Sequence, residues 1–594
     1  MEPYSDTRTS HAASSETANA LIKPRGIRYL SRIEDLLPAL SPGERLLLYI
    51  FTAMLAVSAL ILLANVNARA STIIPTSGGS LTEGVVGTTR FINPLLALTE
   101  SDRDLTLLVY SGLTRARADG SIIPDLASSY EISEDGTVYT FSLRPDLVFH
   151  DGMPITASDI LFTVQMAQNP DTRSSRRADW EGVSVSAPNP QTIIFTLPRP
   201  YAPFLENTTL GILPAHLWQN IPTEEFSFAS RNTDPIGSGP YQIQSITTDK
   251  TGAVTRYDLV PFKNFALGTP HLKKIMFLFF PNEKILIDAW NAARIDSFAG
   301  ITPSELSRLN RDTRIVHPPL PRIFGVFFNQ GHSPSLADAS VRAALDAATD
   351  KQALVDAVLG GYAAIIDGPI PPGILANTNV SSDDNASISF AERTERARNI
   401  LERGGWALDE ETRVWEKGDQ ELTFALATAD TPELVATAEM LTDMWRAAGI
   451  LVDLQVYPIS ELNTNVIRPR SYDALLFGEV VGRTLDLFAF WHSSQRNDPG
   501  LNLALYTNAH TDNLLAQARA TTNRKERETL YGSFVETITK ERPAVFLYTP
   551  QLIYVFPERI RGAEFGVLAS PAERFLNVHE WYTDTERVWS IFTN

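Results

Sequence analysis

The pattern of apolar and polar residues first marks out one long uncharged segment. Residues Leu46 to Ala68 read LLLYIFTAMLAVSALILLANVNA and contain no Asp, Glu, Lys or Arg. At ~1.5 Å per residue, the first nineteen of them would extend about 28 Å as a helix, enough to cross the apolar core of a bilayer. The pattern predicts a transmembrane helix over residues 46–68. A cleaved signal peptide is the alternative, although its apolar region would be shorter and closer to residue 1.

Farther along the chain, strand and helix periodicities alternate. Leu422 to Thr428 alternates as a strand, Pro432 to Ile450 has helical spacing with Pro near its start, and Leu451 to Ile459 alternates again. A strand, a helix and a second strand joined by short connections are typical of a βαβ unit. We therefore expect a largely parallel sheet in this part of the chain.

The region from Gly120 to Thr196 has hairpin signals instead. The turn sequences SEDGT and APNPQT stand at Ser133 to Thr137 and at Ala187 to Thr192. Such spacing predicts a separate antiparallel α+β lobe. Before it, Ile74 to Gly84 reads IPTSGGSLTEG, and this composition predicts a short flexible linker into the first strand.

The segment from Val148 to Thr163, VFHDGMPITASDILFT, raises the question of catalysis because His150 stands beside Asp151. Asp followed by Gly is a turn dipeptide. Thr156 with Asp159 three residues later is typical of a capping box at a helix start. No nucleophile or oxyanion donor is evident nearby, so the segment is interpreted as scaffold.

Charge and cysteine content narrow the function classes. The 594 residues carry a formal charge of −18 and no cysteine. Residues 1–45 are balanced, with six basic and six acidic residues, so the negative charge belongs to the rest of the chain. An acidic domain argues against nucleic-acid binding. The absence of Cys excludes disulfides, thiolate catalysis, Cys-ligated zinc and an acylated lipoprotein anchor.

The basic residues around the uncharged segment predict its orientation. Five of the six basic residues that precede it lie between positions 23 and 45, and one basic residue follows it directly: Lys23, Arg25, Arg28, Arg32 and Arg45, then Arg69. Positive charge stays on the cytoplasmic side of membrane helices. We therefore expect a single-pass protein of the cell membrane, with a cytoplasmic N-terminus and an extracytoplasmic main domain.

Sequence motifs for catalysis, metals and nucleotides are missing. No two of the nine His residues have metal-binding helical spacing, and no HExxH, P-loop, GxSxG or EF-hand motif occurs. The glycine-rich PIGSGPY at Pro235 to Tyr241 is interpreted as a tight turn into a strand. We therefore predict no catalytic residue, no metal ligand and no cofactor.

A series of longer motifs resembles one family, the extracytoplasmic solute-binding proteins of peptide- and nickel-type ABC transporters (solute-binding protein family 5). The resemblance covers about residues 78–590, and the Asp-Gly-x-Pro-x-Thr-Ala-x-Asp string is the family's signature. The motifs that carry it are RFINPLLA (90–97), LVYSGLTR (108–115), LVFHDGMPITASDILFT (147–163), PIGSGPYQI (235–243), FGVFFNQ (324–330), VRAALDAATDKQALV (341–355) and YDALLFG (472–478).

The resemblance implies an α/β, two-lobed periplasmic-binding fold of type II with an inserted extra domain. The expected organisation is a cytoplasmic, largely disordered tail over 1–45, the transmembrane helix over 46–68, a discontinuous domain I over 75–118, 231–330 and 551–594, an inserted domain II over 119–230, and a domain III over 331–550. The ligand is expected between domains I and III. A transmembrane helix departs from the family's usual soluble or lipid-anchored form.

The resemblance also implies a function and partners. The protein is expected to capture a peptide or similar solute without catalysis and to deliver it to an ABC permease driven by ATPase subunits. Family members bind peptides, nickel chelates, haem and sugars, so the ligand stays open. A tethered solute sensor and a membrane-anchored hydrolase are the alternatives, against which count the lack of a signalling domain in the tail and of catalytic motifs.

Candidate ligand-binding residues follow the strand YDALLFG. In the family's peptide binders this strand's Gly is followed by Trp and, three residues later, by an Asp that holds the peptide's amino terminus. Here Glu479 takes the Trp position and Gly482 the Asp position. Glu479, or Asp486 farther along, could bind an ammonium group, and Arg483 a carboxylate. The alternative is that Glu479 and Arg483 are solvated or paired with each other.

Three further residues complete the predicted site. Phe490 and Trp491 in LFAFWHSSQ are expected to stack on the ligand, with two core aromatics as the alternative. Asn329, in the FGVFFNQ motif, is the remaining candidate.

Overall fold

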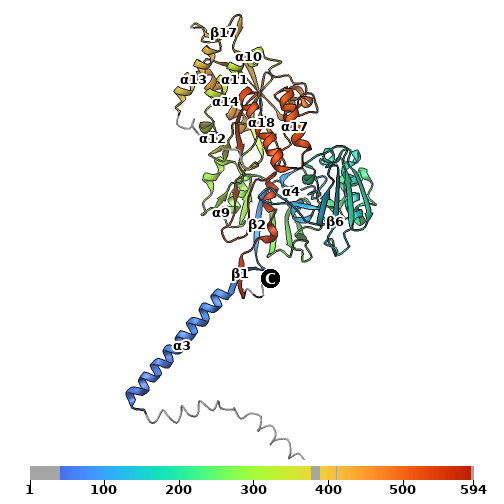
Figure 1. Ribbon diagram of the computed structural model, residues 1–594, viewed down its shortest axis with the longest axis vertical. Helices are drawn as coiled ribbons and strands as arrows, with labels where there is room; N and C mark the ends of the chain where they lie inside the picture. Colours follow the sequence, from blue (N-terminus) through green and yellow to red (C-terminus); the bar gives the residue numbers. More distant parts are fainter. Residues whose placement is uncertain (1–39, 376–387, 410, 590, 592–594) are drawn as a thin grey trace, which may run out of the picture. The chain divides into compact units, whose positions relative to one another are not determined.

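A computed structural model describes the chain except residues 1–39, 376–387, 410, 590 and 592–594 (Figure 1). The chain divides into two units, Met1–Ile74 with Thr585–Asn594, and Pro75–Asp584. Each unit is described by itself. The predicted tail over 1–45 lies almost wholly outside the described residues.

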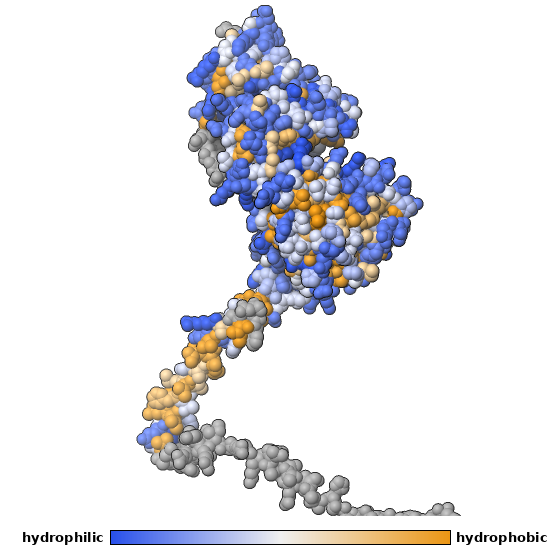
Figure 2. All heavy atoms as spheres, turned by 45° about the vertical axis from the view of Figure 1, so that its right-hand side comes forward, coloured by the Kyte–Doolittle hydropathy of each residue, from blue (hydrophilic) through white to orange (hydrophobic). Residues whose placement is uncertain are grey.

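The first unit contains the predicted apolar helix, α3, Pro42–Ala70. Ser41 caps it, and the Glu44 carboxylate accepts a 2.8 Å hydrogen bond from the Ser41 amide, so the helix begins before the uncharged run. Residues Pro42–Asn67 are long and apolar enough to cross a membrane. Figure 2 shows their apolar side chains along the helix, and its leucines are largely exposed to solvent.

A seven-stranded sheet forms the base of the second unit. Its order is β13-β23-β12-β2-β11-β10-β9. The strands are β2 (Gly78–Val86), β9 (Tyr241–Thr248), β10 (Val254–Pro261), β11 (Leu272–Phe280), β12 (Ser297–Ala299), β13 (Ile315–Val316) and β23 (Tyr554–Val555). The antiparallel pairing predicted for this region is confirmed by a four-stranded sheet of β5 (Ala127–Ile132), β6 (Val138–Leu143), β8 (Thr192–Thr196) and β7 (Ser184–Asn189). The prediction that it forms a separate lobe is wrong, because its buried residues belong to the same hydrophobic core as those of the seven-stranded sheet.

These two sheets share one hydrophobic core, whose buried residues run from Leu81 to Trp581. We call this body lobe 1. The second unit also contains a six-stranded sheet. This sheet has a hydrophobic core of its own, with buried residues between Ile323 and Tyr548, and we call the body around that core lobe 2. Its order is β15-β22-β14-β21-β19-β20. The two-lobed α/β fold expected from the motifs is therefore confirmed.

The predicted βαβ unit of lobe 2 is confirmed. β19 (Thr423–Ala429) and β20 (Leu451–Tyr457) are parallel neighbours joined by α14 (Pro432–Ala447). The expectation of a largely parallel sheet is wrong. β21 (Ala474–Val480), β14 (Arg322–Phe328), β22 (Ala544–Pro550) and β15 (Ala363–Ile365) pair antiparallel in succession. These strands come from segments far apart in the chain, so no local periodicity could predict how they pair.

The chain passes between the lobes twice, and the two passages lie together. One connects β13 to β14, and the other connects β22 to β23. Pro319 and Gln551 form an antiparallel bridge. The Leu320 amide donates to the Pro550 carbonyl at 3.0 Å, and the Leu552 amide to Pro318 at 2.9 Å. The strand β14 lies inside the lobe 2 sheet, ahead of the boundary that the sequence places at residue 330.

The expected flexible linker over 74–84 is ordered, which corrects that prediction. Its residues belong to β1 (Ser71–Thr76) and β2, which pairs in parallel with β11 from Gly78 to Val86. A Cβ at Gly78 would overlap the Asp584 carboxylate. The glycine therefore serves a close approach of two chain segments rather than flexibility.

The segment around His150 is scaffold, as predicted. The Thr156 amide donates to the Asp159 carboxylate at 2.9 Å at the start of α5 (Ala157–Gln168). His150 Nε2 lies 3.1 Å from the Gly239 carbonyl oxygen, and the Gly237 amide donates to its Nδ1 at 3.4 Å. Burial lowers the pKa of His150 to about 4. The ring is therefore neutral and holds the PIGSGPY turn in place.

Candidate ligand-binding site

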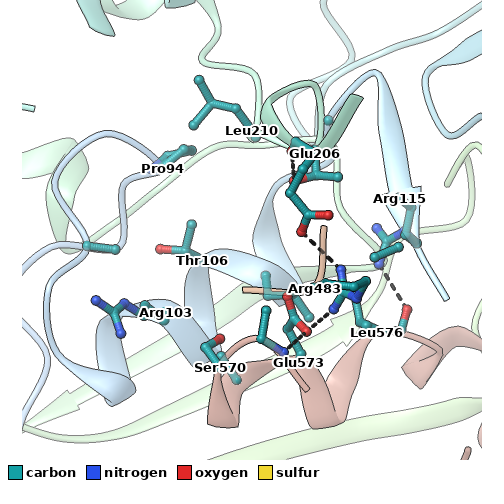
Figure 3. A pocket seen from close by; sticks show the side chains of 18 of the residues that line it. Pro94, Arg103, Thr106, Arg115, Glu206, Leu210, Arg483, Ser570, Glu573 and Leu576 are labelled. Carbon is teal, nitrogen blue, oxygen red and sulfur yellow. Dashed lines mark hydrogen bonds and ion pairs between the residues drawn. The ribbon is translucent and has the colours of Figure 1, made fainter. Parts of the chain in front are cut away.

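A cavity of about 530 Å³ lies where a loop of lobe 2 meets lobe 1 (Figure 3). Its volume is in the range of small-molecule sites. Lobe 1 supplies most of the lining. Lobe 2 supplies the segment that follows β21, namely Val480, Gly482, Arg483 and Thr484.

Three short elements of lobe 1 carry the polar lining. α4 (Glu100–Val109) presents Arg103 and Thr106, and its N-terminus is fixed by a capping box between Thr99 and Asp102. The single turn α7 (Phe204–Asn207) presents Glu206. The 3₁₀ turn η8 (Pro571–Phe575) presents Glu573.

Arg483 joins the lobes by pairing with two carboxylates of lobe 1. Its Nη1 lies 3.1 Å from Glu206 Oε1, and its Nη2 contacts Glu573 Oε2. The Arg483 side chain is only 4% exposed. Burial raises the pKa of Glu573 to about 7, although the Arg483 charge opposes the rise. Near neutral pH this cluster of one arginine and two carboxyls therefore changes between net neutral and net negative.

Several buried polar atoms beside the cavity have no partner within the described protein. They are Thr106 Oγ1, Tyr110 Oη, Glu206 Oε2 and Arg483 Nε. Buried polar groups in folded proteins are normally hydrogen-bonded. Each of these atoms can therefore bond to a ligand or to water in the cavity.

The cavity lining also contains arginines outside the Arg483 cluster. Arg103 and Arg176 are two of them, and their carboxylate partners are Glu100 at 3.3 Å and Asp179 at 3.0 Å, each three residues away. Both arginines are about 40% exposed, at 42% and 38%. Figure 3 shows Arg103 well away from the Arg483 cluster. Arg115, in contrast, is committed to Asp125 at 2.9 Å and to the Leu576 carbonyl at 3.0 Å.

A buried ion network beneath the cavity fixes η8. Arg574, the neighbour of Glu573, donates to Asp104 at 2.6 and 2.7 Å and to Glu83 at 3.0 Å. All three side chains are at most 3% exposed. Because a broken buried pair leaves an uncompensated charge, the network holds η8, and with it Glu573, in one position.

The sequence-predicted Glu479 is buried away from this lining. It is 4% exposed, and neither of its carboxylate oxygens has a partner among the described residues. Burial raises its pKa well above the usual value. Val480 lines the cavity, and adjacent residues of a strand face opposite sides. Glu479 and Arg483 are therefore neither solvated nor paired with each other, so both versions of that alternative fail.

Asp486 takes part in a second contact between the lobes. It forms an ion pair with Arg519 at 2.9 Å and accepts a 3.3 Å hydrogen bond from the Tyr201 hydroxyl of lobe 1. Burial raises its pKa against the effect of Arg519. The Arg519 guanidinium also lies over the Tyr201 ring at 5.0 Å.

The remaining predicted residues lie within lobe 2. Trp491, on α16 (Phe488–Trp491), is 1% exposed and has ring contacts with Phe327, Tyr506, Phe534 and Phe546. Phe490 packs against the same core while partly exposed. Asn329 is 5% exposed and donates to the Arg470 carbonyl at 3.0 Å. None of the three lines the cavity described above.

Sequence reasoning named Arg483 as a candidate for binding a ligand carboxylate, but it did not identify the two protein carboxylates that face it. Glu206 stands in PFLENTT and Glu573 in SPAERF, and neither segment carries a recognisable binding motif. They are 277 and 90 residues from Arg483. Only the packing of two lobes brings the three together.

The family is settled by a match across most of the chain. Residues 121–501 match the family model described as the middle region of bacterial extracellular solute-binding proteins, family 5. This chain belongs to that family. It is therefore a solute-binding component of an ABC import system and works outside the cytoplasm.

The alignments with relatives extend over nearly the whole length of each relative. The oligopeptide-binding protein AppA of Bacillus subtilis is 25% identical over 552 residues, covering 89% of this chain and 98% of AppA. The structure of NikZ from Campylobacter jejuni in complex with Ni(L-His) is 26% identical, with a TM-score of 0.63, covering 85% of this chain and 99% of NikZ. The unliganded open form of the murein tripeptide-binding protein MppA shares the fold, with a TM-score of 0.71, 18% identity, and coverage of 86% and 99%.

Proposed function

We propose that this family 5 protein captures a peptide or a similar zwitterionic solute between its lobes and delivers it to an ABC permease. The observation that carries the proposal is the charge distribution of the cavity. A carboxylate oxygen of Glu206 has no partner among the described residues on one side, and Arg103 stands on the other side (Figure 3), with Arg176 also in the lining. A free amino group suits the first side and a free carboxylate the second.

In this proposal the ligand competes for groups that already join the lobes. An ammonium group bonds to Glu206 and Glu573, and Arg483 shares these carboxylates with it. A closing motion would bend the two adjacent passages around Pro319 and Gln551, which link the lobes covalently. Closing about such paired links is a hinge motion, and it removes the ligand from water.

The apolar helix α3 completes the proposal as a membrane anchor. Its span Pro42–Asn67 keeps the binding unit at the outer surface of the cell membrane, with the preceding residues on the cytoplasmic side. An anchored receptor searches for its permease in two dimensions. The relatives named for oligopeptide and murein tripeptide binding support a peptide-type ligand.

Calorimetry with a matched peptide series tests the proposal. The full chain in nanodiscs is titrated with a short alanine peptide that has free ends, with its N-acetylated form and with its C-amidated form. We expect the free peptide to bind most tightly, and each blocked end to weaken binding by about 1.5–3 kcal/mol, the range for a hydrogen bond to a charged group.

Two arginine variants identify the carboxylate end. Arg103→Gln should weaken binding of the peptide with free ends and leave the affinity for the C-amidated peptide unchanged. Arg446→Gln is the matched control, because Arg446 also pairs with an acid three residues away, Asp443 at 2.8 Å, but does not line the cavity. Equal affinity of all three peptides for the unmodified protein would exclude zwitterion recognition.

A further inference from the structure

The C-terminal residues belong with the apolar helix rather than with the binding unit. Thr585–Asn594 and Met1–Ile74 form one compact unit. Within it β24 (Asp584–Trp589) pairs with β1, the strand that begins directly after α3 ends at Ala70. The chain therefore returns at its end to the point where the candidate membrane span stops.

Two side-chain contacts tie this return to the helix. The Trp589 indole Nε1 donates to Asn67 Oδ1 at 2.7 Å. The Thr72 hydroxyl donates to the Val588 carbonyl at 3.5 Å. Asn67 is the last residue of the span Pro42–Asn67. Trp589 is thus held beside the end of the span.

The same place exposes three large apolar side chains. Trp589 is 50% exposed, Ile73 61% and Ile591 71%. Arg69 lies in the last turn of α3, and Arg587, two residues before Trp589, shares its strand face by alternation. Trp with flanking Arg is the composition found at the interface between lipid tails and water, because the indole is apolar with one polar N–H.

We propose that the ribbon of β1 and β24 is a second membrane contact, with Trp589, Ile73 and Ile591 in the outer interfacial layer of the bilayer. The inference rests on the proposed anchor α3, because the ribbon continues the surface that α3 offers to lipid. The ribbon surface is thus proposed to contact the interfacial layer of the lipid bilayer, not another protein. Both ends of the binding unit are then tethered at the membrane, one through β1 and the other through β24.

Because the chain has no cysteine, a single introduced cysteine can be labelled without removing native ones. Four single-cysteine versions of the full chain carry an environment-sensitive fluorophore: Trp589→Cys, Ile591→Cys, Leu55→Cys within the span and Phe228→Cys in the binding unit. Leu55 and Phe228 are 73% and 79% exposed. Ile591→Cys keeps Trp589 and its bond to Asn67, so it reports on the ribbon even if the Trp589 variant loosens it.

Each protein is placed in phosphatidylcholine–phosphatidylglycerol nanodiscs with spin-labelled lipids that quench at shallow or at deep positions. We expect the labels at 589 and 591 to be quenched more by the shallow lipid, the label at 55 more by the deep lipid, and the label at 228 by neither. Labels at 589 and 591 that behave like the label at 228, while 55 is quenched, overturn this inference alone. An unquenched label at 55 overturns the anchor and the inference with it.

Discussion

Arg483 and Glu206, which are 277 residues apart in the chain, form a 3.1 Å ion pair that joins lobe 2 to lobe 1 beside the cavity. Glu206 keeps its second oxygen, Oε2, buried and without a partner. A single carboxylate therefore both joins the lobes and offers a bond to the ligand. Ligand binding and lobe contact are physically coupled through it.

Replacing Glu206 tests this coupling. Glu206→Gln should weaken the binding of a peptide with a free amine by about 1.5–3 kcal/mol, because a hydrogen bond to a charged group is lost. The N-acetylated peptide should bind the variant and the unmodified protein alike. Glu528→Gln is the matched control, since Glu528 pairs with Arg524 at 3.0 Å and is similarly exposed, 24% against 22% for Glu206, but does not line the cavity. Equal losses for both peptides would exclude Glu206 as the amine anchor.

The raised pKa of Glu573 predicts a pH dependence of binding. The carboxyl titrates at about 7 in the folded protein. An ammonium ligand favours the ionised form, so its affinity should rise with pH through this value, by about tenfold for each unit by which binding lowers the pKa. Calorimetry from pH 6 to 8 measures the slope. Glu573→Gln should flatten it, and an unchanged slope in this variant would assign the dependence to another group.

The same pKa affects stability with the opposite sign. Between the usual glutamate pKa of 4.5 and about 7, the folded state holds a proton that the unfolded state releases. The free energy of unfolding contributed by Glu573 therefore falls as the pH rises through that window. Binding and stability data should thus be collected together across the range.

Glu479 is expected to titrate as a buried, unpartnered acid. Its raised pKa means that stability falls as the pH rises above the usual range of glutamate, by up to about 1.4 kcal/mol per pH unit. Chemical denaturation at several pH values should show a smaller fall for Glu479→Gln. The sequence hypothesis that Glu479 holds an amine predicts instead a binding loss of ~1.5–3 kcal/mol, restricted to ligands with a free amine. Full affinity in Glu479→Gln would dismiss that hypothesis.

Trp491 should matter mainly to stability. It is 1% exposed among four aromatic rings, and truncating such a side chain costs roughly 3–5 kcal/mol. Denaturant titration of Trp491→Ala should show this loss, while the folded fraction keeps its affinity. Phe490→Ala, at a partly exposed position on the same helix, is the comparison. If Trp491→Ala binds the ligand more weakly while its free energy of unfolding stays unchanged, the stacking role predicted from the sequence would be supported.

Deleting residues 1–70 tests the anchor. The deletion removes α3 but keeps β1, which starts at Ser71 and pairs with β24. We expect a soluble, monomeric protein that binds the same ligand. Fractionation of cells and light scattering provide the measurements. Recovery of the shortened chain in the membrane pellet that Trp589→Ala does not change would contradict the anchor. Recovery that Trp589→Ala abolishes would instead point to the ribbon.

Local sequence determined the elements whose causes lie within a few residues. The apolar helix needs only its composition, because a helix satisfies its own backbone hydrogen bonds. The start of α5 needs only Thr156 and Asp159, three positions apart. The βαβ unit follows from two alternations around one helical period. The family motifs then added the two-lobed arrangement.

Tertiary structure decided everything that depends on partners far along the chain. Gly78 reads as part of a flexible linker until the Asp584 carboxylate lies against it. Trp491 reads as a ligand contact until four aromatic rings surround it. Glu206 and Glu573 carry no signal in their own segments, and only the fold places Arg483 between them and raises the pKa of Glu573 by burial. Burial and charge pairing depend on distances in space, and a residue's neighbours in sequence do not encode contacts made across 90 or 277 positions.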